Sequence, residues 1–277
     1  MMELEAKIIK ISTQNIAYYE SSGEGKTIFL IHGNSSSGRS YVNQLQGELG
    51  EMYHLIAMDL PGHGLSDVAA APEVTYSLPG YAAAVVEVAE ALDASEAIFV
   101  GWSLGGHILL EAVDKLTDAQ GIVIFGTPPI ANDPPDLEKA FLPHSALSLG
   151  FTLELTQEDM LAYVTTFFRP EIEEIPELFL EDIALNDGQS RAHLGASINP
   201  DGYQDEIEVV GNMTIPLMII HGEKDQLVNK DYIAELEMPT LWNGKIQFIA
   251  DAGHAPHWEA PNKFNSLLTD FITNMQR

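Results

Sequence analysis

A chain of 277 residues, 45% of them hydrophobic, has room for one large α/β domain with an insertion, and its lack of cysteine excludes disulfides, thiol nucleophiles and thiolate metal sites. The formal net charge of -28 disfavours nucleic acid and anionic membranes as partners. The acidic start has no long apolar run, and every apolar run is far shorter than a membrane span, so we expect a cytoplasmic protein without a signal peptide.

The first half of the chain alternates between short apolar runs and helical patterns. Two short strands are expected at 7–11 and 15–19, buried strands at 27–31, 53–58, 98–100 and 121–126, and helices at 40–49, 78–92 and 108–116. This alternation predicts a mostly parallel sheet with helices on both faces.

The pattern changes between 130 and 213. Residues 131–210 include 17 acidic and 3 basic side chains and no clear buried strand. A capping box at 156–159 predicts a helix through 168, and further helices are expected at 176–185 and 191–198. We therefore predict a helical cap at 130–213, inserted into a core domain made of 1–129 and 214–277. Strands at 215–220 and 245–250 complete an eight-stranded sheet, and a helix at 264–275, preceded by Pro261, closes the core.

A Gly-x-Ser-x-Gly motif at 101–105 joins a predicted buried strand to a predicted helix. Glycines at both ends let the helix pass close to the strand and let Ser103 adopt a strained conformation with its hydroxyl exposed. The amide of Leu104, in the first helical turn, has no intrahelical partner and can donate to an oxyanion. We expect the second oxyanion donor to be the backbone amide of Asn34, in the loop after strand 27–31.

A serine nucleophile needs a histidine base and an acid that orients the base. Asp225 and His254 follow two predicted strands of the second half, and the chain order Ser, Asp, His is the order expected for this chemistry on a parallel sheet. Glu223 and Asp251 compete with Asp225 for the acid role. Asp225 could instead cap a helix expected at 229–236.

The remaining histidines have other expected roles. His221 and His257 are expected to be packing or surface groups, His32 and His63 to order loops through backbone hydrogen bonds, and His107 to pack at the cap interface. The sequence contains no His-x-His pair, so we expect neither a metal-dependent route nor a cofactor.

Taken together, these motifs resemble the α/β-hydrolase superfamily along nearly the whole chain. Finer motifs resemble the metal-independent N-acyl-homoserine lactonases of the AidH type; they lie at 32–38, 101–107, 126–129, 241–242, 252–256 and 259–261. That resemblance implies hydrolysis of a homoserine lactone, a quorum-quenching activity, with the acyl chain in a tunnel under the cap. It also implies a substrate contact from a cap tyrosine, which Tyr163 matches. We expect Trp102 and Gly33, inside two of the motifs, to contact the substrate as well.

Two alternatives remain open from the residues. One is a general carboxylesterase on small acyl esters, which would use the same residues with a different pocket. The other is a small-molecule binding module that keeps the pocket without catalysis. A serine at position 103 argues against haloalkane dehalogenases and epoxide hydrolases, whose nucleophile is aspartate.

Overall fold

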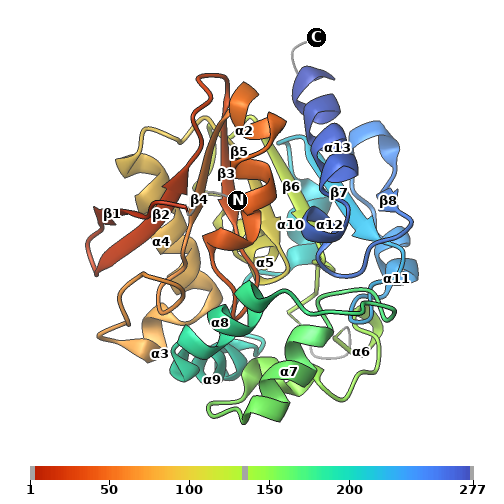
Figure 1. Cartoon of the computed structure of the whole chain (residues 1–277). Helices are drawn as coiled ribbons and strands as arrows, with labels where there is room; N and C mark the ends of the chain where they lie inside the picture. The colour runs from red at the N-terminus through yellow and green to blue at the C-terminus, as the bar shows by residue number, and fades with distance from the viewer. Residues whose placement is uncertain (1–3, 133–136, 275–277) are drawn as a thin grey trace.

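The computed structural model describes residues 4–132 and 137–274, which are built around one eight-stranded sheet with the order β1-β2-β4-β3-β5-β6-β7-β8 (Figure 1). The strands are β1 Lys7–Lys10, β2 Asn15–Glu20, β3 Thr27–Ile31, β4 His54–Met58, β5 Ile98–Trp102, β6 Gly121–Phe125, β7 Leu217–Gly222 and β8 Gln247–Ile249. The β1–β2 and β2–β4 pairs are antiparallel, and all other pairs are parallel. The mostly parallel eight-stranded sheet is therefore confirmed.

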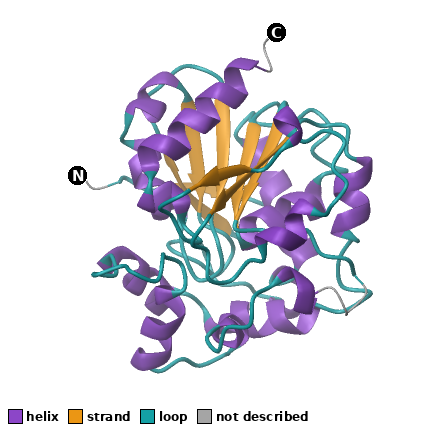
Figure 2. Ribbon diagram, turned by 90° about the vertical axis from the view of Figure 1, so that its right-hand side faces the viewer, coloured by secondary structure: helices purple, strands orange, loops and turns teal. Residues whose placement is uncertain are grey.

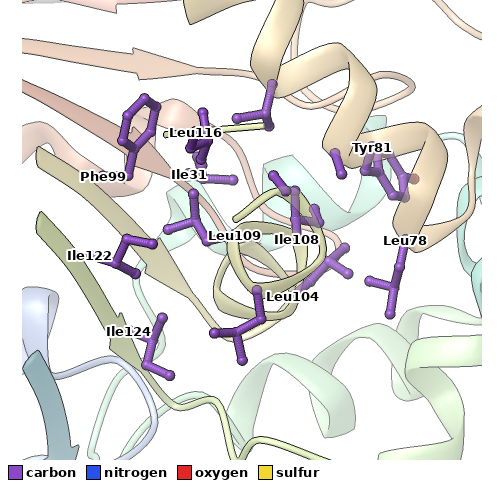
Figure 3. Packing of buried hydrophobic residues seen from close by; sticks show 14 of the residues in the cluster. Ile31, Leu78, Tyr81, Phe99, Leu104, Ile108, Leu109, Leu116, Ile122 and Ile124 are labelled. Carbon is purple, nitrogen blue, oxygen red and sulfur yellow. The ribbon is translucent and has the colours of Figure 1, made fainter. Parts of the chain in front are cut away.

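Helices cover both faces of the sheet, because successive side chains of the buried strands point to opposite faces. Along β3, Phe29 and Ile31 join one apolar cluster, whereas Ile28 and Leu30 join the other. The first cluster packs under α4 Leu78–Ala91, α5 Leu104–Ala112, α10 Glu206–Asn212 and α11 Lys230–Ala234; Figure 3 shows it around α5. The second packs under α1 Val42–Leu45, α2 Glu48–Met52, α12 Pro256–Glu259 and α13 Pro261–Asn274.

All named elements in the described part of 130–213 are helical: α6 Leu137–Ala140, η3 Leu147–Phe151, α7 Gln157–Thr165, α8 Glu177–Leu185, α9 Gly188–Ser197 and α10. In Figure 1 the helices α6 to α9 lie together below the sheet, and Figure 2 shows the same group outside the layers that flank it. The last helix, α10, instead contributes Val210 to the cluster under α5. The division into core and cap stays a prediction.

Local capping explains where the helices of this segment begin. The Thr156 hydroxyl accepts from the Asp159 amide at 3.2 Å while the Asp159 carboxylate accepts from the Thr156 amide at 2.9 Å, so the predicted capping box is present. Helix α9 begins earlier than predicted, because the Asp187 carboxylate accepts from the Gln189 amide at 3.0 Å and caps it.

Several boundaries differ from the predictions. The helix expected at 40–49 is divided into η1 Gly38–Tyr41, α1 and α2, with a break at Gly47, whose backbone is extended at φ -96° and ψ -177°. Strand β7 begins at 217 because Pro216 has no N–H for the ladder, and it continues through His221 and Gly222. The expected end of the closing helix at Met275 lies outside the described residues.

The remaining short elements are α3 Pro72–Thr75 and η4 Trp242–Gly244. Among all helices in the described ranges, none is long and apolar enough to cross a membrane.

Candidate active site

Ser103 lies at the junction of β5 and α5 in a strained backbone conformation, with φ +52° and ψ -116°. A Cβ atom on Gly101 would lie 2.4 Å from the Gly105 carbonyl oxygen, and one on Gly105 would lie 2.3 Å from the Ile31 carbonyl oxygen. Glycine at both positions is therefore what lets α5 begin so close to β5 and β3. The Thr127 hydroxyl donates to the Ser103 carbonyl oxygen at 2.8 Å and helps to hold the turn, whose strain costs about 1–3 kcal/mol.

His254 and Asp225 come from the loops after β8 and β7 and meet in a buried hydrogen bond. Nδ1 of His254 lies 2.8 Å from Oδ2 of Asp225. The other carboxylate oxygen, Oδ1, accepts from the amides of Leu227 at 2.8 Å and Val228 at 3.1 Å. Burial alone would raise the pKa of Asp225, but the His254 imidazole and these hydrogen bonds outweigh it, so the pKa lies below its ordinary value. With its proton held on Nδ1, the imidazole has Nε2 free to accept another.

The ends of neighbouring strands position the His254 ring. Gly126, directly after β6, has φ +61°, and a Cβ atom there would lie 2.9 Å from Cε1 of His254. The indole N–H of Trp102, the last residue of β5, donates to the His254 carbonyl oxygen at 2.8 Å. The imidazole therefore fits only because residue 126 has no side chain.

The two competing acids lie elsewhere. Glu223 is exposed, and the Asp251 side chain is 88% exposed beside Lys224. The side chain that caps α11 is Asn229, which accepts from the Asp231 amide at 3.1 Å. The structure thus brings Asp225 to the imidazole, and the capping role considered for it belongs to Asn229.

The loop after β3 passes directly beside the nucleophile candidate. A Cβ atom on Gly33 would lie 3.2 Å from Cβ of Ser103 and 3.1 Å from the Trp102 ring. Within the described part of the chain, the amides of Asn34 and Leu104 donate to no protein acceptor, which leaves both for an oxyanion. Both residues line the cavity that Ser103 also lines.

Asn34 and Tyr163 form a polar contact above this loop. The Asn34 side-chain amide donates to the Gly150 carbonyl oxygen at 2.7 Å, which ties the loop to η3. The Tyr163 hydroxyl lies close to the Asn34 side chain, and burial raises the pKa of this tyrosine well above its ordinary value. Tyr163 lines the cavity from α7, as a substrate contact would require.

Trp102 and Gly33 do not belong to the cavity wall. Trp102 is fully buried, with its ring centroid 5.4 Å from that of Phe167 and 4.8 Å from that of His257. The structure gives their expected substrate contact no support; Trp102 instead anchors the His254 backbone, and Gly33 makes room for Trp102 and Ser103.

A cavity of about 940 Å³ extends from Ser103 and His254 towards α6, η3 and α9. Its wall is mostly apolar; the leucine, isoleucine and phenylalanine residues that line it are Leu78, Leu104, Ile130, Leu137, Phe141, Leu142, Leu147, Phe151, Phe167, Leu194, Ile198 and Leu227. The size of this cavity and its few convergent polar groups are typical of a site that binds a small molecule.

Two of the remaining histidines order loops through the backbone, as expected. His32 Nδ1 lies 2.7 Å from the Gly33 carbonyl oxygen and its Nε2 accepts from the Leu60 amide at 2.9 Å, while His63 Nδ1 lies 3.0 Å from the Pro61 carbonyl oxygen. Burial lowers the pKa of His63 to about 4, so it is neutral at pH 7.

His257 and His221 are packing groups. Both are buried, and burial lowers the pKa of His257 to about 3. Neither ring nitrogen of His257, nor Nδ1 of His221, has a hydrogen-bond partner among the described residues.

Two acidic residues that were not predicted from the sequence hold parts of the site. Glu259 accepts from the amides of Gly253 and Arg169, the latter at 3.0 Å, and thereby joins the His254 loop to the segment after α7. Glu206 on α10 pairs with His107 at the cavity wall. In the sequence, Glu259 lies inside one of the family-like motifs, whereas Glu206 gives no signal because it resembles a solvated helix start.

The residues that the structure describes contain no group of three or more His, Cys, Asp or Glu side chains arranged to hold a metal ion. The catalytic roles of the residues around the Ser103 cavity stay predictions.

Comparison with known proteins identifies the family of the chain and several similar proteins. The model of the alpha/beta hydrolase family matches residues 28–267. Two solved structures of mutants of the N-acyl homoserine lactonase AidH are similar over nearly the full length of both chains. The one complexed with N-hexanoyl homoserine has a TM-score of 0.94 and 33% identity, covering 99% of this chain and 98% of that chain. The one complexed with N-hexanoyl homoserine lactone has a TM-score of 0.93 and 32% identity, covering 98% of each chain.

More distant relatives have other names. The pimeloyl-[acyl-carrier protein] methyl ester esterase of Xylella fastidiosa is 26% identical and covers 93% of this chain and 99% of its own length. A Synechocystis sp. protein provisionally named a non-heme chloroperoxidase is 24% identical, over 92% of this chain and 94% of its own length.

Proposed function

The chain belongs to the alpha/beta hydrolase family, and within it we propose that this protein is a serine hydrolase that opens the lactone ring of N-acyl homoserine lactones. The observation that carries the proposal is the likeness to AidH, at a TM-score of 0.94 over 99% of this chain. The pairing of His254 with Asp225, and the cavity that His254 shares with Ser103, support the same chemistry.

Ring opening begins when Nε2 of His254 takes the proton of the Ser103 hydroxyl and the oxygen attacks the lactone carbonyl carbon. Asp225 keeps the other imidazole proton on Nδ1 and stabilises the imidazolium that forms. The tetrahedral oxyanion accepts from the amides of Asn34 and Leu104, which lie on the same cavity wall.

Collapse of this intermediate breaks the bond between the carbonyl carbon and the ring oxygen. The ring oxygen takes the proton from His254 and leaves as a hydroxyl that is still tethered to the acylated serine. A water molecule then gives a proton to His254 and attacks the ester carbon. As the bond between this carbon and Oγ of Ser103 breaks, His254 returns the proton to Oγ, and an N-acyl homoserine with a free carboxylate is released. No step needs a metal ion.

The cavity suits the acyl chain of such a substrate. Its apolar wall extends from the nucleophile towards α6, η3 and α9, so a chain that starts at the reacting end can follow it. We propose that residues 130–213 act as the cap that closes this space, and that Tyr163, which lies on α7, contacts the substrate.

A second candidate is a carboxylesterase on simple acyl esters, which the likeness to the Xylella fastidiosa esterase favours. The two functions share the nucleophile and differ in the alcohol or ring that the cavity accepts. Comparing kcat/KM for N-hexanoyl homoserine lactone with kcat/KM for p-nitrophenyl butyrate separates them. A lactonase opens the lactone efficiently; a protein that turns over only the p-nitrophenyl ester is an esterase.

A further inference from the structure

A second histidine–carboxylate pair faces the cavity one helical turn from the nucleophile. Nδ1 of His107, on α5, lies 2.9 Å from both carboxylate oxygens of Glu206, the first residue of α10. Glu206 is only 1% exposed and also accepts from the Ile130 amide at 2.9 Å. The proposed triad does not use this pair.

The hydrogen bonds of Glu206 fix which nitrogen of His107 carries the proton. A carboxylate only accepts, so the proton of the imidazole must lie on Nδ1. In the neutral ring Nε2 is then an acceptor. The Ile130 amide, which donates to the same carboxylate, holds Glu206 in place and prevents it from turning away.

Nε2 of His107 is left for a ligand. No residue in the described ranges hydrogen-bonds to it, and His107 lines the same cavity as Ser103. His107 lies in the first turn after Ser103, because its backbone amide donates to the Ser103 carbonyl oxygen at 3.3 Å. The side chains of both residues line the cavity, whose wall is largely apolar.

We propose that His107 is a specificity-determining residue that accepts a hydrogen bond from the amide N–H of the acylamino substrate, and that Glu206 positions it. This inference rests on the proposed lactonase function. In an N-acyl homoserine lactone the amide nitrogen is bonded to the carbon next to the lactone carbonyl, so it lies just beyond the attacked carbon. An amide N–H brought into an apolar cavity without an acceptor would lose its hydrogen bond to water.

The test uses two substrates that differ in one atom. One is N-hexanoyl homoserine lactone, and the other is its analogue with an ester oxygen in place of the amide nitrogen, which keeps the shape and lacks the donor. Ring opening is followed by mass spectrometry of the products. We expect wild type to prefer the amide about tenfold in kcat/KM. In His107→Phe this preference disappears, because the amide rate falls to the rate of the analogue.

Glu206→Gln tests the positioning role. A glutamine amide can donate to Nδ1 of His107, which moves the imidazole proton to Nε2. The Nε2–H group and the amide N–H of the substrate are then both donors and cannot hydrogen-bond to each other. We expect the amide preference to disappear in this variant too. His144→Phe replaces another imidazole of the cavity wall and should keep the preference. Hydrolysis of p-nitrophenyl butyrate, which has no acylamino group, is measured in each variant and reports a folded site.

Each possible outcome either supports the role of His107 or overturns a named part of the proposal. An amide preference lost in His107→Phe and Glu206→Gln and kept in His144→Phe supports the inference. Equal losses on both lactones, or a preference that survives in His107→Phe, overturn it. Wild type that opens neither lactone but hydrolyses p-nitrophenyl butyrate overturns the lactonase proposal itself, and wild type that opens both lactones equally overturns only the role of His107.

Discussion

Replacing Asp225 by asparagine should inactivate the enzyme while keeping the shape of the site. Oδ1 of Asp225 accepts from the amides of Leu227 and Val228, and Oδ2 faces His254. In Asp225→Asn the two loop amides require the carbonyl oxygen of the new side chain, so its NH₂ group is directed at Nδ1 of His254. An NH₂ group can only donate, so it forces the imidazole proton onto Nε2.

The proton on Nε2 removes the base. That nitrogen can then no longer accept the proton of Ser103, and the imidazolium also loses the negative charge that stabilises it at 2.8 Å. A wrong tautomer of this kind costs about 10⁴ in kcat in serine hydrolases. We expect a loss of that size in Asp225→Asn, together with an unchanged KM, because no substrate contact is lost.

The assay is the steady-state hydrolysis of p-nitrophenyl butyrate, with Asp251→Asn as the matched control. The Asp251 side chain is 88% exposed, so the same chemical change there should leave kcat unchanged. The reasoning is refuted if Asp225→Asn keeps more than about a tenth of the wild-type rate, or if Asp251→Asn is the inactive variant.

Further predictions concern the packing, pH dependence and metal independence of the site. Gly126→Ala would place a Cβ atom 2.9 Å from Cε1 of His254, at a backbone φ of +61°, and should lower kcat at least about tenfold. The control is Gly244→Ala: Gly244 has a similar φ of +62°, but a Cβ atom there would meet no atom within 4 Å. This control should therefore lose a similar amount of stability and keep the wild-type kcat. Equal kcat in the two variants would contradict the account. Burial raises the pKa of Asp59 to about 6, so the folded state binds more protons than the unfolded state between about pH 4 and pH 6. The contribution of Asp59 to the free energy of unfolding should therefore fall by about 3 kcal/mol as the pH rises through this window, measured as the difference between wild type and Asp59→Asn in urea titrations; a constant difference would be evidence against the raised pKa. Incubation with EDTA should leave the hydrolysis rate unchanged, and a loss that zinc restores would contradict a metal-free mechanism.

Local sequence signals were enough to predict the turn that contains Ser103. A buried strand, two glycines and a helix determine the backbone around Ser103 within a few residues, and the strained φ of +52° follows from that short stretch. Strands β7 and β8 could be predicted in the same way, although β7 continues to Gly222, beyond its expected end at 220. The Asp225–His254 pair follows because parallel strands present their carboxyl ends at one edge.

Contacts between distant segments could not be predicted. Glu206 lies between Asp205 and Glu208 in what resembles the solvated start of a helix, yet it is 1% exposed against His107, 99 positions earlier. Nothing in either local pattern specifies that α10 packs on α5. The burial of Glu206 therefore depends on the tertiary packing alone.

The substrate contact expected for Trp102 stays a prediction. Side chains alternate along a strand, so Trp102 lies on the same face of β5 as Val100 and belongs to the same hydrophobic cluster, and it is not among the residues that line the cavity. The break at Gly47 was missed, because residues 40–49 have the apolar content of one helix and the interruption depends on how α2 packs beneath the sheet.

The most direct test of the central claim is rapid acid quench of the enzyme during turnover of p-nitrophenyl butyrate, followed by mass spectrometry of the digested protein. The account predicts a butyryl group on the peptide that contains Ser103, and neither this adduct nor turnover in Ser103→Ala. A butyryl group on another residue, or a Ser103→Ala variant that keeps a substantial fraction of the wild-type rate, would contradict it.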